Sequence, residues 1–289
     1  MNISRTWRQI LSNEDINFLL TNRIPRQGFT HFMGWLSHIQ NRHLTRWALK
    51  IWSWFDDIDL SESKSTRFDS IHAFFIRELK EGVRPIHQAT DTLTSPCDGI
   101  IGAHGQIEDG QLFQAKGFPY RLEELIGDTP MAAHWRHGQF ITLRIRASMY
   151  HRFHAPCDGR LTQVRYFSGD TWNVNPIALQ RVEKLFCKNE RALLLVENST
   201  HKNVIAMVPV AAVLVASIRL HAIDTVLHLR YPGPHLIDCD SAFVKGEELG
   251  WFQHGSTIIM LTPPGYALAP GLANGQVVRM GQALMVKTA

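Results

Sequence analysis

The segment Phe140-Ile141-Thr142-Leu143-Arg144-Ile145-Arg146 decides the fold class of this chain, because apolar and polar residues alternate along it. A period of two is the pattern of a strand with one buried face. Two apolar stretches, Ala192–Val196 and the valine-rich Val204–Ala216, predict strands buried on both faces. Thr225–Arg230 and Ser256–Leu261 alternate less regularly and also predict strands. The larger, C-terminal part of the chain is therefore expected to be rich in β-structure.

The N-terminal part has a helical pattern instead. Apolar residues spaced close to 3.6 predict a helix over residues 29–55, and a second helix is predicted over Ile71–Leu79. We therefore expect an α+β chain, with a helical N-terminal portion over residues 1–88 and a β-rich, sandwich-like body over residues 89–289. The apolar residues of the first predicted helix are Phe32, Leu36, Ile39, Trp47, Ile51 and Trp54.

Basic charge is concentrated at the N-terminus. The formal net charge is +4, but residues 1–54 contain seven Lys or Arg and only two acids, a balance of +5 that leaves −1 for the rest. Arg42, Arg46 and Lys50 form a basic stripe beside the apolar face, and five of the eight tryptophans lie in this segment. This composition suits a helix lying in a membrane interface. It suits equally a helix packed on the protein's own core with solvated charges.

Length and composition indicate a folded protein, with 289 residues of which 45% are hydrophobic and 19% charged. No window approaches 18 uninterrupted apolar residues, so no transmembrane helix is expected, and the first residues lack the apolar stretch of a signal peptide. The default expectation is the cytoplasm. The four cysteines form no C-x-x-C pair, and neither a disulfide framework nor a structural zinc site is expected.

A short internal echo relates Ser95-Pro96-Cys97-Asp98-Gly99-Ile100 to Ala155-Pro156-Cys157-Asp158-Gly159-Arg160. Pro-x-Asp-Gly is first of all a turn signature, in which proline fixes φ and aspartate caps the turn. The echo suggests two similar turn units of a duplicated sandwich, although six residues do not establish duplication. Asp98 and Asp158 are equal candidates for a functional carboxylate, and each has the alternative of only capping its turn.

Two further segments carry reactive groups. In Tyr150-His151-Arg152-Phe153-His154, the two histidines would share a face of a helix but point to opposite sides of a strand. With an acid they could bind a metal, or they could act as acid and base. The second segment, Lys245–Thr257, ends in Gly255-Ser256-Thr257. It could form an ordinary turn, or it could present a hydroxyl beside an unhindered glycine carbonyl.

Six stretches together resemble the phosphatidylserine decarboxylase family, whose prokaryotic-type members are made as proenzymes. They occur in the family's order along most of the chain. Each is weak alone, but the ordered set is specific. The stretches are Phe74–Ile86, Ser95–Gly99, Tyr150–Gly159, Asn173–Pro176, Val208–Ile218 and Lys245–Thr257.

The resemblance implies a self-cleavage site at Gly255-Ser256, where cutting gives chains 1–255 and 256–289 that stay associated. It implies a triad of Asp98, His154 and Ser256, and so selects Asp98 over Asp158. Ser256 becomes a covalent pyruvoyl group, which forms a Schiff base with phosphatidylserine and releases CO2 to give phosphatidylethanolamine. His151 is implicated in handling the substrate. No metal and no nucleic acid partner are expected.

Four positions depart from the family pattern. His254 precedes the cleavage site where the family often has an apolar residue, and Trp172 stands where phenylalanine is usual. Ala211 and Ala216 replace two glycines, and alanine does not adopt positive φ as cheaply as glycine. None of these changes removes a reacting group.

A lipid substrate also bears on the basic N-terminal segment. The resemblance favours docking of residues 1–55 on an anionic membrane, which implies a peripheral protein on the cytoplasmic face of the cell membrane. A homodimer of the processed two-chain unit is a further expectation. Two alternatives remain open at this point: an unprocessed lipid-binding relative without catalysis, and a metal-dependent hydrolase that uses Asp98, His151 and His154.

Overall fold

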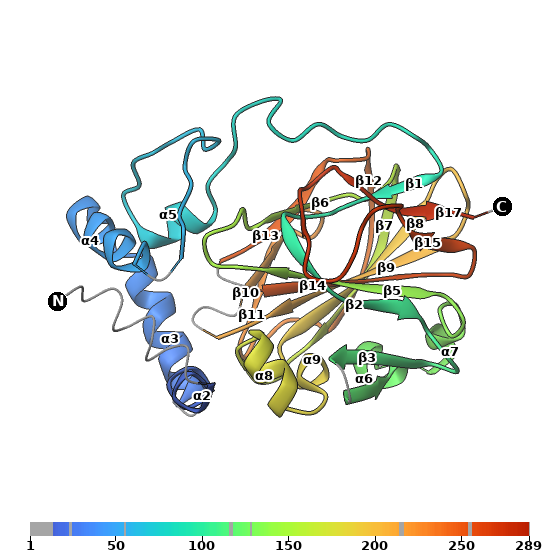
Figure 1. The fold of residues 1–289 in the computed structure, drawn as a ribbon, viewed down its shortest axis with the longest axis horizontal. Helices are drawn as coiled ribbons and strands as arrows, with labels where there is room; N and C mark the ends of the chain where they lie inside the picture. Colours follow the sequence, from blue (N-terminus) through green and yellow to red (C-terminus); the bar gives the residue numbers. More distant parts are fainter. Residues whose placement is uncertain are drawn as a thin grey trace.

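The computed structural model shows a strand-rich body with a group of helices at one side (Figure 1). The mixed helix and strand class predicted from the sequence is confirmed. No helix within the described ranges is long and apolar enough to cross a membrane. The structure describes residues 14–22, 25–54, 56–115, 118–127, 129–213, 217–253 and 256–288.

The N-terminal helices differ from the prediction. The single helix expected over residues 29–55 is wrong, because α3 (Arg26–Ser37) ends and α4 (Arg42–Trp52) begins within that span. Asn41 starts the second helix, since its side-chain oxygen accepts hydrogen bonds from the backbone N–H groups of His43 and Leu44, both at 3.0 Å. Before them lies α2 (Glu14–Asn22).

The helix predicted over Ile71–Leu79 is also shorter than expected, because α5 covers only Ile71–Phe75. The residues after it pair with an earlier loop. The backbone N–H of Lys64 donates to Glu78 O, and that of Lys80 donates to Glu62 O, both at 2.9 Å. Extended pairing therefore replaces the last helical turn.

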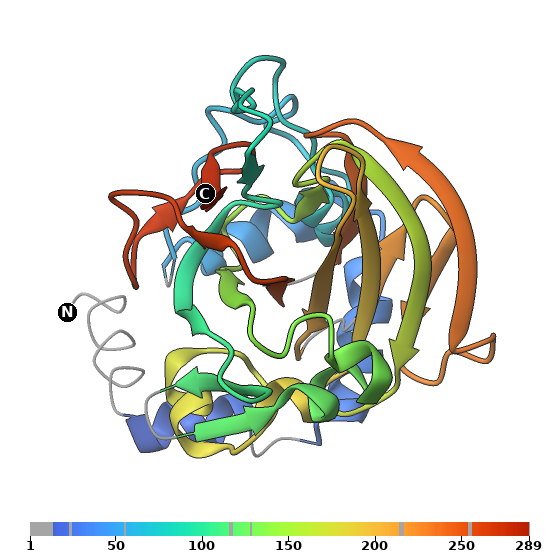
Figure 2. The ribbon, with the colours of Figure 1, turned by 90° about the vertical axis from the view of Figure 1, so that its right-hand side faces the viewer.

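The body is built on an eight-stranded antiparallel sheet with the order β12-β7-β8-β9-β14-β5-β2-β16. It is strongly curved, with β2 and β12 on opposite sides of the body (Figure 2). All five strand segments predicted from the sequence are present as strands, but β9 ends at Ala211, earlier than expected. The strands are β2 (Gly99–Gln106), β5 (Gln139–Ile145), β7 (Gly159–Phe167), β8 (Arg191–Asn198), β9 (Val204–Ala211), β12 (Leu236–Phe243), β14 (Ser256–Thr262) and β16 (Val277–Val278).

Smaller elements cover this sheet. A four-stranded sheet has the order β11-β10-β13-β6, a three-stranded sheet has the order β1-β17-β15, and β3 pairs with β4. Four short helices complete the body. The bounds are β11 (Thr225–His228), β10 (Ser217–Leu220), β13 (Glu248–Phe252), β6 (Arg152–His154), β1 (Thr92–Thr94), β17 (Ala283–Lys287), β15 (Tyr266–Leu268), β3 (Gln111–Ala115), β4 (Phe118–Arg121), α6 (Leu122–Ile126), α7 (Thr129–Ala132), α8 (Pro176–Arg181) and α9 (Leu185–Lys188).

The core divides between the two faces of the large sheet. Along β14, Ile258 and Met260 belong to one apolar cluster, which the smaller sheets cover. Ile259 and Leu261 belong to the other cluster, which α6, α8 and α9 cover. Every side chain of β14 is buried. The apolar residues of this strand lie on both faces because both faces are covered, whereas the sequence pattern of Ser256–Leu261 indicated an irregularly alternating strand.

The two echoed turns contact each other reciprocally. The backbone N–H of Thr94 donates to Pro156 O at 2.9 Å, and the backbone N–H of His154 donates to Pro96 O at 2.7 Å. These four residues occupy equivalent places in the two repeats. The sequence echo is therefore a local twofold relationship in space, and it brings the turn of Asp98 against the strand that carries His154.

The relationship extends to a second pair of loops. Asp98 Oδ1 accepts from the backbone N–H of Met280 at 2.8 Å, and Asp158 Oδ1 accepts from that of Lys245 at 2.7 Å. Each of these donors precedes a glycine with positive φ, Gly281 or Gly246. Each aspartate side chain thus caps an equivalent loop that is distant in the sequence, rather than its own turn as the turn signature suggested.

Candidate active site

Ser256 is the first residue of β14 and lies inside the large sheet. It is paired with Ile145 of β5 on one side and with Ala211 of β9 on the other. It is fully buried, at 0% exposure. His254 and Gly255, the other residues of the predicted cleavage site, lie outside the described residues. The sequence left open whether Ser256 belongs to a turn, and the structure places it at the start of a strand.

His154 ends β6, the neighbour of the strand β13 that precedes Ser256 in the chain, and His151 comes directly before β6. Strand β6 pairs with β13, with His154 opposite Glu248. The backbone N–H of Phe252, the last residue of β13, donates to His151 O at 2.9 Å. The segment is extended rather than helical, so His151 and His154 point to opposite sides.

His154 is held as a neutral base. Its Nδ1 lies 2.9 Å from Gly246 O and must donate there, because a carbonyl oxygen only accepts. Nε2 therefore carries the lone pair, and it accepts from the Tyr150 hydroxyl at 3.0 Å. Burial lowers the pKa of His154 below its ordinary value, although the Gly246 contact and the charges of Glu248 and Asp98 oppose this. The ring is thus in the tautomer and charge state that a general base needs.

His151 is fully buried, and its environment differs from that of His154. Its Nδ1 donates to Met149 O at 2.8 Å, which again leaves Nε2 as the nitrogen with the lone pair. The ring stands edge-on to Phe75 of α5, with the ring centroids 5.1 Å apart. The helical portion therefore helps to fix this histidine.

Asp98 is bound by an arginine that sequence reasoning did not single out. Arg84 donates to both carboxylate oxygens, from Nε at 2.9 Å and from Nη2 at 2.6 Å. Within the described part of the chain, Asp98 and His154 share no direct hydrogen bond; they are linked through the backbone contact between His154 and Pro96. The charge of Asp98 raises the pKa of His154 as a minor influence beside burial, which lowers it.

Asp158 has the same turn but a different setting. Asp98 is buried, whereas Asp158 is exposed. Only Asp98 has a buried arginine partner among the described residues. The tertiary environment therefore separates the two aspartates that spacing alone left equal. Arg84 belongs to the Phe74–Ile86 stretch, which was the one available signal for it.

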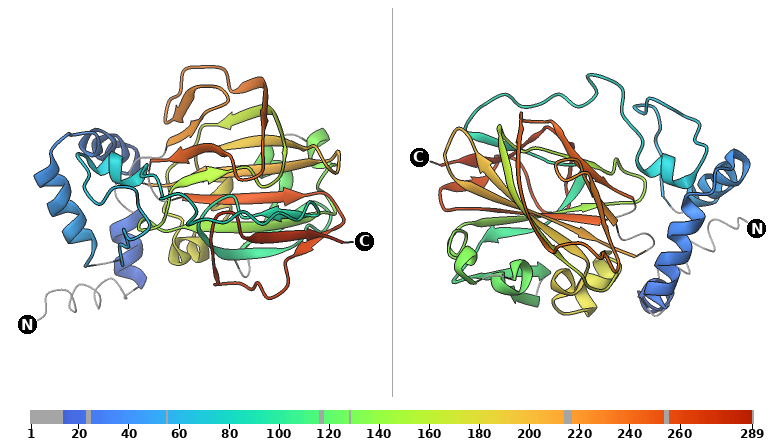
Figure 3. Two further views of the ribbon diagram at one scale, coloured as in Figure 1. Left: turned by 90° about the horizontal axis from the view of Figure 1, so that it is seen from above. Right: turned by 180° about the vertical axis from the view of Figure 1, so that it is seen from behind.

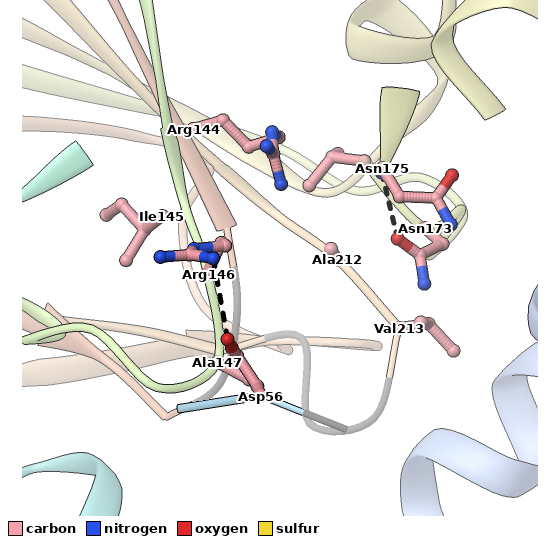
Figure 4. A pocket seen from close by; sticks show the side chains of 10 residues that line it. Asp56, Arg144, Ile145, Arg146, Ala147, Asn173, Asn175, Ala212 and Val213 are labelled. Atoms are coloured by element: carbon pink, nitrogen blue, oxygen red, sulfur yellow. Dashed lines mark hydrogen bonds and ion pairs between the residues drawn. The ribbon is translucent and has the colours of Figure 1, made fainter. Parts of the chain in front are cut away.

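A pocket of about 200 Å³ lies at the end of the sheet where β14 begins (Figure 4). It is lined by Ile145, the strand partner of Ser256, and by Ala212, which follows the other partner. Its polar lining includes Arg144 and Arg146. The full lining is Asp56, Arg144, Ile145, Arg146, Ala147, Asn173, Val174, Asn175, Ala212 and Val213.

A second hollow, of about 480 Å³, lies on the side of Tyr150. Arg84, Arg152 and Glu248 line it together with Tyr150, whose hydroxyl contacts His154. Arg152 donates from Nη1 to Glu248, at 2.9 Å and 2.8 Å to its two oxygens, and fixes this wall. The strand partner Ile145 of Ser256 thus lines the first hollow, and Tyr150, the hydrogen-bond partner of His154, lines the second.

Two local features of the chain bear on its chemistry, the alanines that replace family glycines and the grouping of side chains that can bind a metal. Ala211 is not among the described residues with positive φ, so β9 does not need the glycine that the family pattern has there. Ala216 lies outside the described residues. In the described ranges, no group of three or more His, Cys, Asp or Glu side chains is arranged to hold a metal ion.

Comparison with known proteins agrees with the resemblance. The family model "Phosphatidylserine decarboxylase" matches residues 71–286. A phosphatidylserine decarboxylase proenzyme of Yersinia pestis (strain Pestoides F) is 35% identical over 289 residues, which cover 94% of this chain and 96% of that protein. The proenzyme of Yersinia pseudotuberculosis serotype O:3 (strain YPIII) matches with the same identity and coverage.

Proposed function

The chain belongs to the phosphatidylserine decarboxylase family of lyases, and we propose that it matures by cutting itself between Gly255 and Ser256 before it acts on phosphatidylserine. One observation carries the proposal: Ser256 begins a buried central strand four residues after Phe252, the end of the strand that pairs with β6 and whose backbone N–H donates to His151 O. A serine that served only in a surface turn would need neither a place inside a central strand nor histidines close by.

The cut begins with attack of the Ser256 hydroxyl oxygen on the carbonyl carbon of Gly255. The hydroxyl proton passes to Nε2 of His154, and the Gly255–Ser256 amide becomes an ester with a free amine on Ser256. The Tyr150 hydroxyl, which now donates to Nε2, must first turn away. The charge of Asp98 stabilises the imidazolium that forms.

Loss of the Ser256 α-proton then expels the Gly255 carboxylate and leaves a dehydroalanine. Its hydrolysis releases ammonia and gives a pyruvoyl group at the start of chain 256–289. The site fits this group, because residue 256 lies at a strand end beside a pocket and between two flanking strands. When present, such a ketone takes up the substrate amine and accepts the electrons released with CO2.

The chain's own residues supply the remaining functions. His151, held by Met149 O and Phe75, is the proposed proton donor to the α-carbon after CO2 leaves. Its Nε2, which carries the lone pair in this structure, must first take up a proton, and the imidazolium then donates that proton and returns to the neutral form. Its burial keeps bulk water from competing for that step.

A homodimer of the processed unit stays a prediction.

The helical portion is proposed to dock on the cytoplasmic face of an anionic membrane. It stands at one side of the strand-rich body (Figure 3). On α4, Leu44, Trp47 and Ile51 are exposed and share one face, with Trp47 at 63% exposure. Arg42, Arg46 and Lys50 flank that stripe. Exposed tryptophan beside basic charge supports an interfacial position.

The test is the covalent state of the full-length protein. Intact mass and a denaturing gel should show two chains divided at 255/256, the smaller one resisting N-terminal sequencing because it begins with a ketone. Ser256→Ala and His154→Ala should stay uncut. Ser199→Ala and His201→Ala, which change residues on a turn elsewhere, should cut normally. A single intact wild-type chain under active conditions would contradict the mechanism and favour an unprocessed lipid-binding protein.

A further inference from the structure

We propose that Arg144 and Arg146 form a binding site for the phosphodiester of the lipid headgroup, in the pocket at the start of β14. The inference rests on the proposed function, because it assigns this pocket to the substrate of the reaction at residue 256. It adds the residues that recognise the group next to the reacting serine moiety.

The position of the pocket is the first argument. Arg144 lies opposite Thr257 in the pairing of β5 with β14, one residue beyond Ser256. Its side chain reaches from β5 toward the loop of Asn173 and Asn175 (Figure 4). Arg144 and Ser256 lie on opposite faces of the sheet, but the proposed cut makes residue 256 a chain end. Its reactive carbon then lies at the open end of β14, where the pocket is.

The charge of the pocket is the second argument. Its lining contains two arginines and one acid, Asp56, which pairs with Arg146 at 3.5 Å. Within the described part of the chain, no ion pair or side-chain hydrogen bond engages Arg144. Burial, reinforced by the charge of Arg146 and opposed by the charge of Asp56, lowers the pKa of the Arg144 guanidinium. A half-buried cation without an ion-pair partner is costly, and an anionic ligand would complete the site.

The amide of Asn173 adds a neutral donor. Its Oδ1 accepts from the backbone N–H of Asn175 at 2.9 Å, and this contact directs Nδ2 away from the loop backbone. No hydrogen bond from that Nδ2 is found among the described residues. Two guanidinium groups and an amide are donors of the kind that recognise phosphate oxygens.

The chemistry of the substrate favours phosphate over carboxylate as the bound group. A cation on the carboxylate would stabilise the charge that must leave as CO2, and so it would favour the ground state over the transition state. The phosphodiester keeps its charge throughout. It is joined to the amine-bearing carbon by one methylene and one oxygen, so a phosphate site close to residue 256 matches the headgroup.

The experiment uses soluble headgroup analogues, so that membrane docking does not enter. Glycerophosphoserine carries the phosphodiester, and O-methylserine carries the same amine and carboxylate without it. In the processed wild-type protein, kcat/KM should be higher for glycerophosphoserine. Arg144→Gln should reduce that preference about tenfold or more, mainly by raising KM for glycerophosphoserine. It should leave kcat/KM for O-methylserine unchanged. Arg144→Lys should restore part of the preference.

Arg146→Gln should act in the same direction more weakly, because Asp56 already pairs with Arg146. The matched control is Arg160→Gln, an exposed arginine paired with Asp240 on the same sheet. An unchanged preference in Arg144→Gln would overturn the proposal. An equal loss of kcat/KM for O-methylserine would also overturn it, because Arg144 would then bind the carboxylate of the serine moiety.

Intact mass separates this result from failure of the proposed function. If the wild-type chain is uncut, the cleavage mechanism is wrong, and the site is tested by ³¹P NMR titration of glycerophosphoserine. Binding that Arg144→Gln weakens and Arg160→Gln does not would retain the phosphate site. Absence of binding would reject it. Misfolding of Arg144→Gln, seen as a lowered thermal midpoint, leaves Arg144→Lys and Arg146→Gln to decide.

Discussion

Arg84 holds Asp98 through two parallel hydrogen bonds, and the side chains of both residues are almost fully buried, at 8% and 10% exposure. Arg84 also pairs with Glu62 through Nη1 at 2.7 Å. The acid assigned to the self-cleavage triad is therefore held by a cation rather than by His154. In the proposed self-cleavage, Arg84 would be a positioning residue, because its two hydrogen bonds hold the Asp98 carboxylate in place.

Arg84→Gln should slow self-cleavage and destabilise the fold. Removing one partner of a buried pair costs about 3–5 kcal/mol, since the other charge stays buried. Arg84→Lys should retain more of both properties. Gel quantification of the cut fraction over time and urea unfolding measure the two effects. The control is Arg279→Gln, which loses a pair with Glu62 but has no contact with Asp98. A folded Arg84→Gln protein that cuts at the wild-type rate would remove Arg84 from the mechanism.

The pH dependence of self-cleavage should follow His154. Only the neutral imidazole accepts the Ser256 proton, so the rate falls as pH drops through the His154 pKa. Burial lowers that pKa below the ordinary value of 6.5, and the acid limb should therefore lie below pH 6.5. Freshly synthesised precursor, sampled over time between about pH 5 and 8, gives the profile. A midpoint at or above 6.5 would rule out a buried, neutral His154 as the base.

Replacing Trp35 and Trp47 by alanine should weaken binding to anionic vesicles. Both side chains are exposed, at 65% and 63%. Burying each in a membrane interface should stabilise the bound state by about 1.5–3 kcal/mol. Vesicle co-sedimentation at low and high salt measures the loss. Phe113→Ala is the control, because Phe113 is exposed on β3 of the body. Equal binding of the double variant and the wild type would argue against docking by α3 and α4.

Glu190→Gln should stabilise the protein above neutral pH. Burial raises the pKa of Glu190 to about 7, and Tyr166, Ser168 and Gly169 surround its carboxyl group. The unfolded chain loses this proton near its ordinary value of 4.5, so wild-type stability falls as pH rises from there through 7.

Glutamine has no proton to lose and mimics the protonated acid. It should gain about 2 kcal/mol over the wild type at pH 8 and little at pH 5. Urea midpoints at the two pH values measure this, with the exposed Glu197→Gln as control. A loss of stability at pH 8 would show that the charged carboxylate is the favoured form.

The strands were predictable from sequence because burial on one or both faces determines their residue pattern. Val204–Ala211 is apolar throughout and Ser256–Thr262 has an apolar centre at Ile258–Leu261, and both are central strands. The first helix was misjudged because its apolar period continues across residues 38–41. Asn41 was the local signal for the break, since its side chain caps α4.

The site was only partly predictable. Local spacing could not separate Asp98 from Asp158, because the difference is made by Arg84, 14 positions away, and by burial. The sequence also left the conformation of His151–His154 open, since pairing with β13 is a tertiary contact. Arg144 was visible only as the polar position of a strand, and its role depends on the pocket that several elements form.

The central position of β14, between β5 and β9, has a consequence for how the protein is inactivated by unfolding. Once the proposed cut is made, residues 256–289 are a separate molecule inserted in the middle of a sheet. Hydrogen bonds on both edges keep it there, but no peptide bond would return it after unfolding. The uncut precursor would refold as one chain, whereas the mature protein would irreversibly lose chain 256–289, which carries the reactive residue 256. Its lifetime is then governed by the rate of unfolding rather than by an equilibrium.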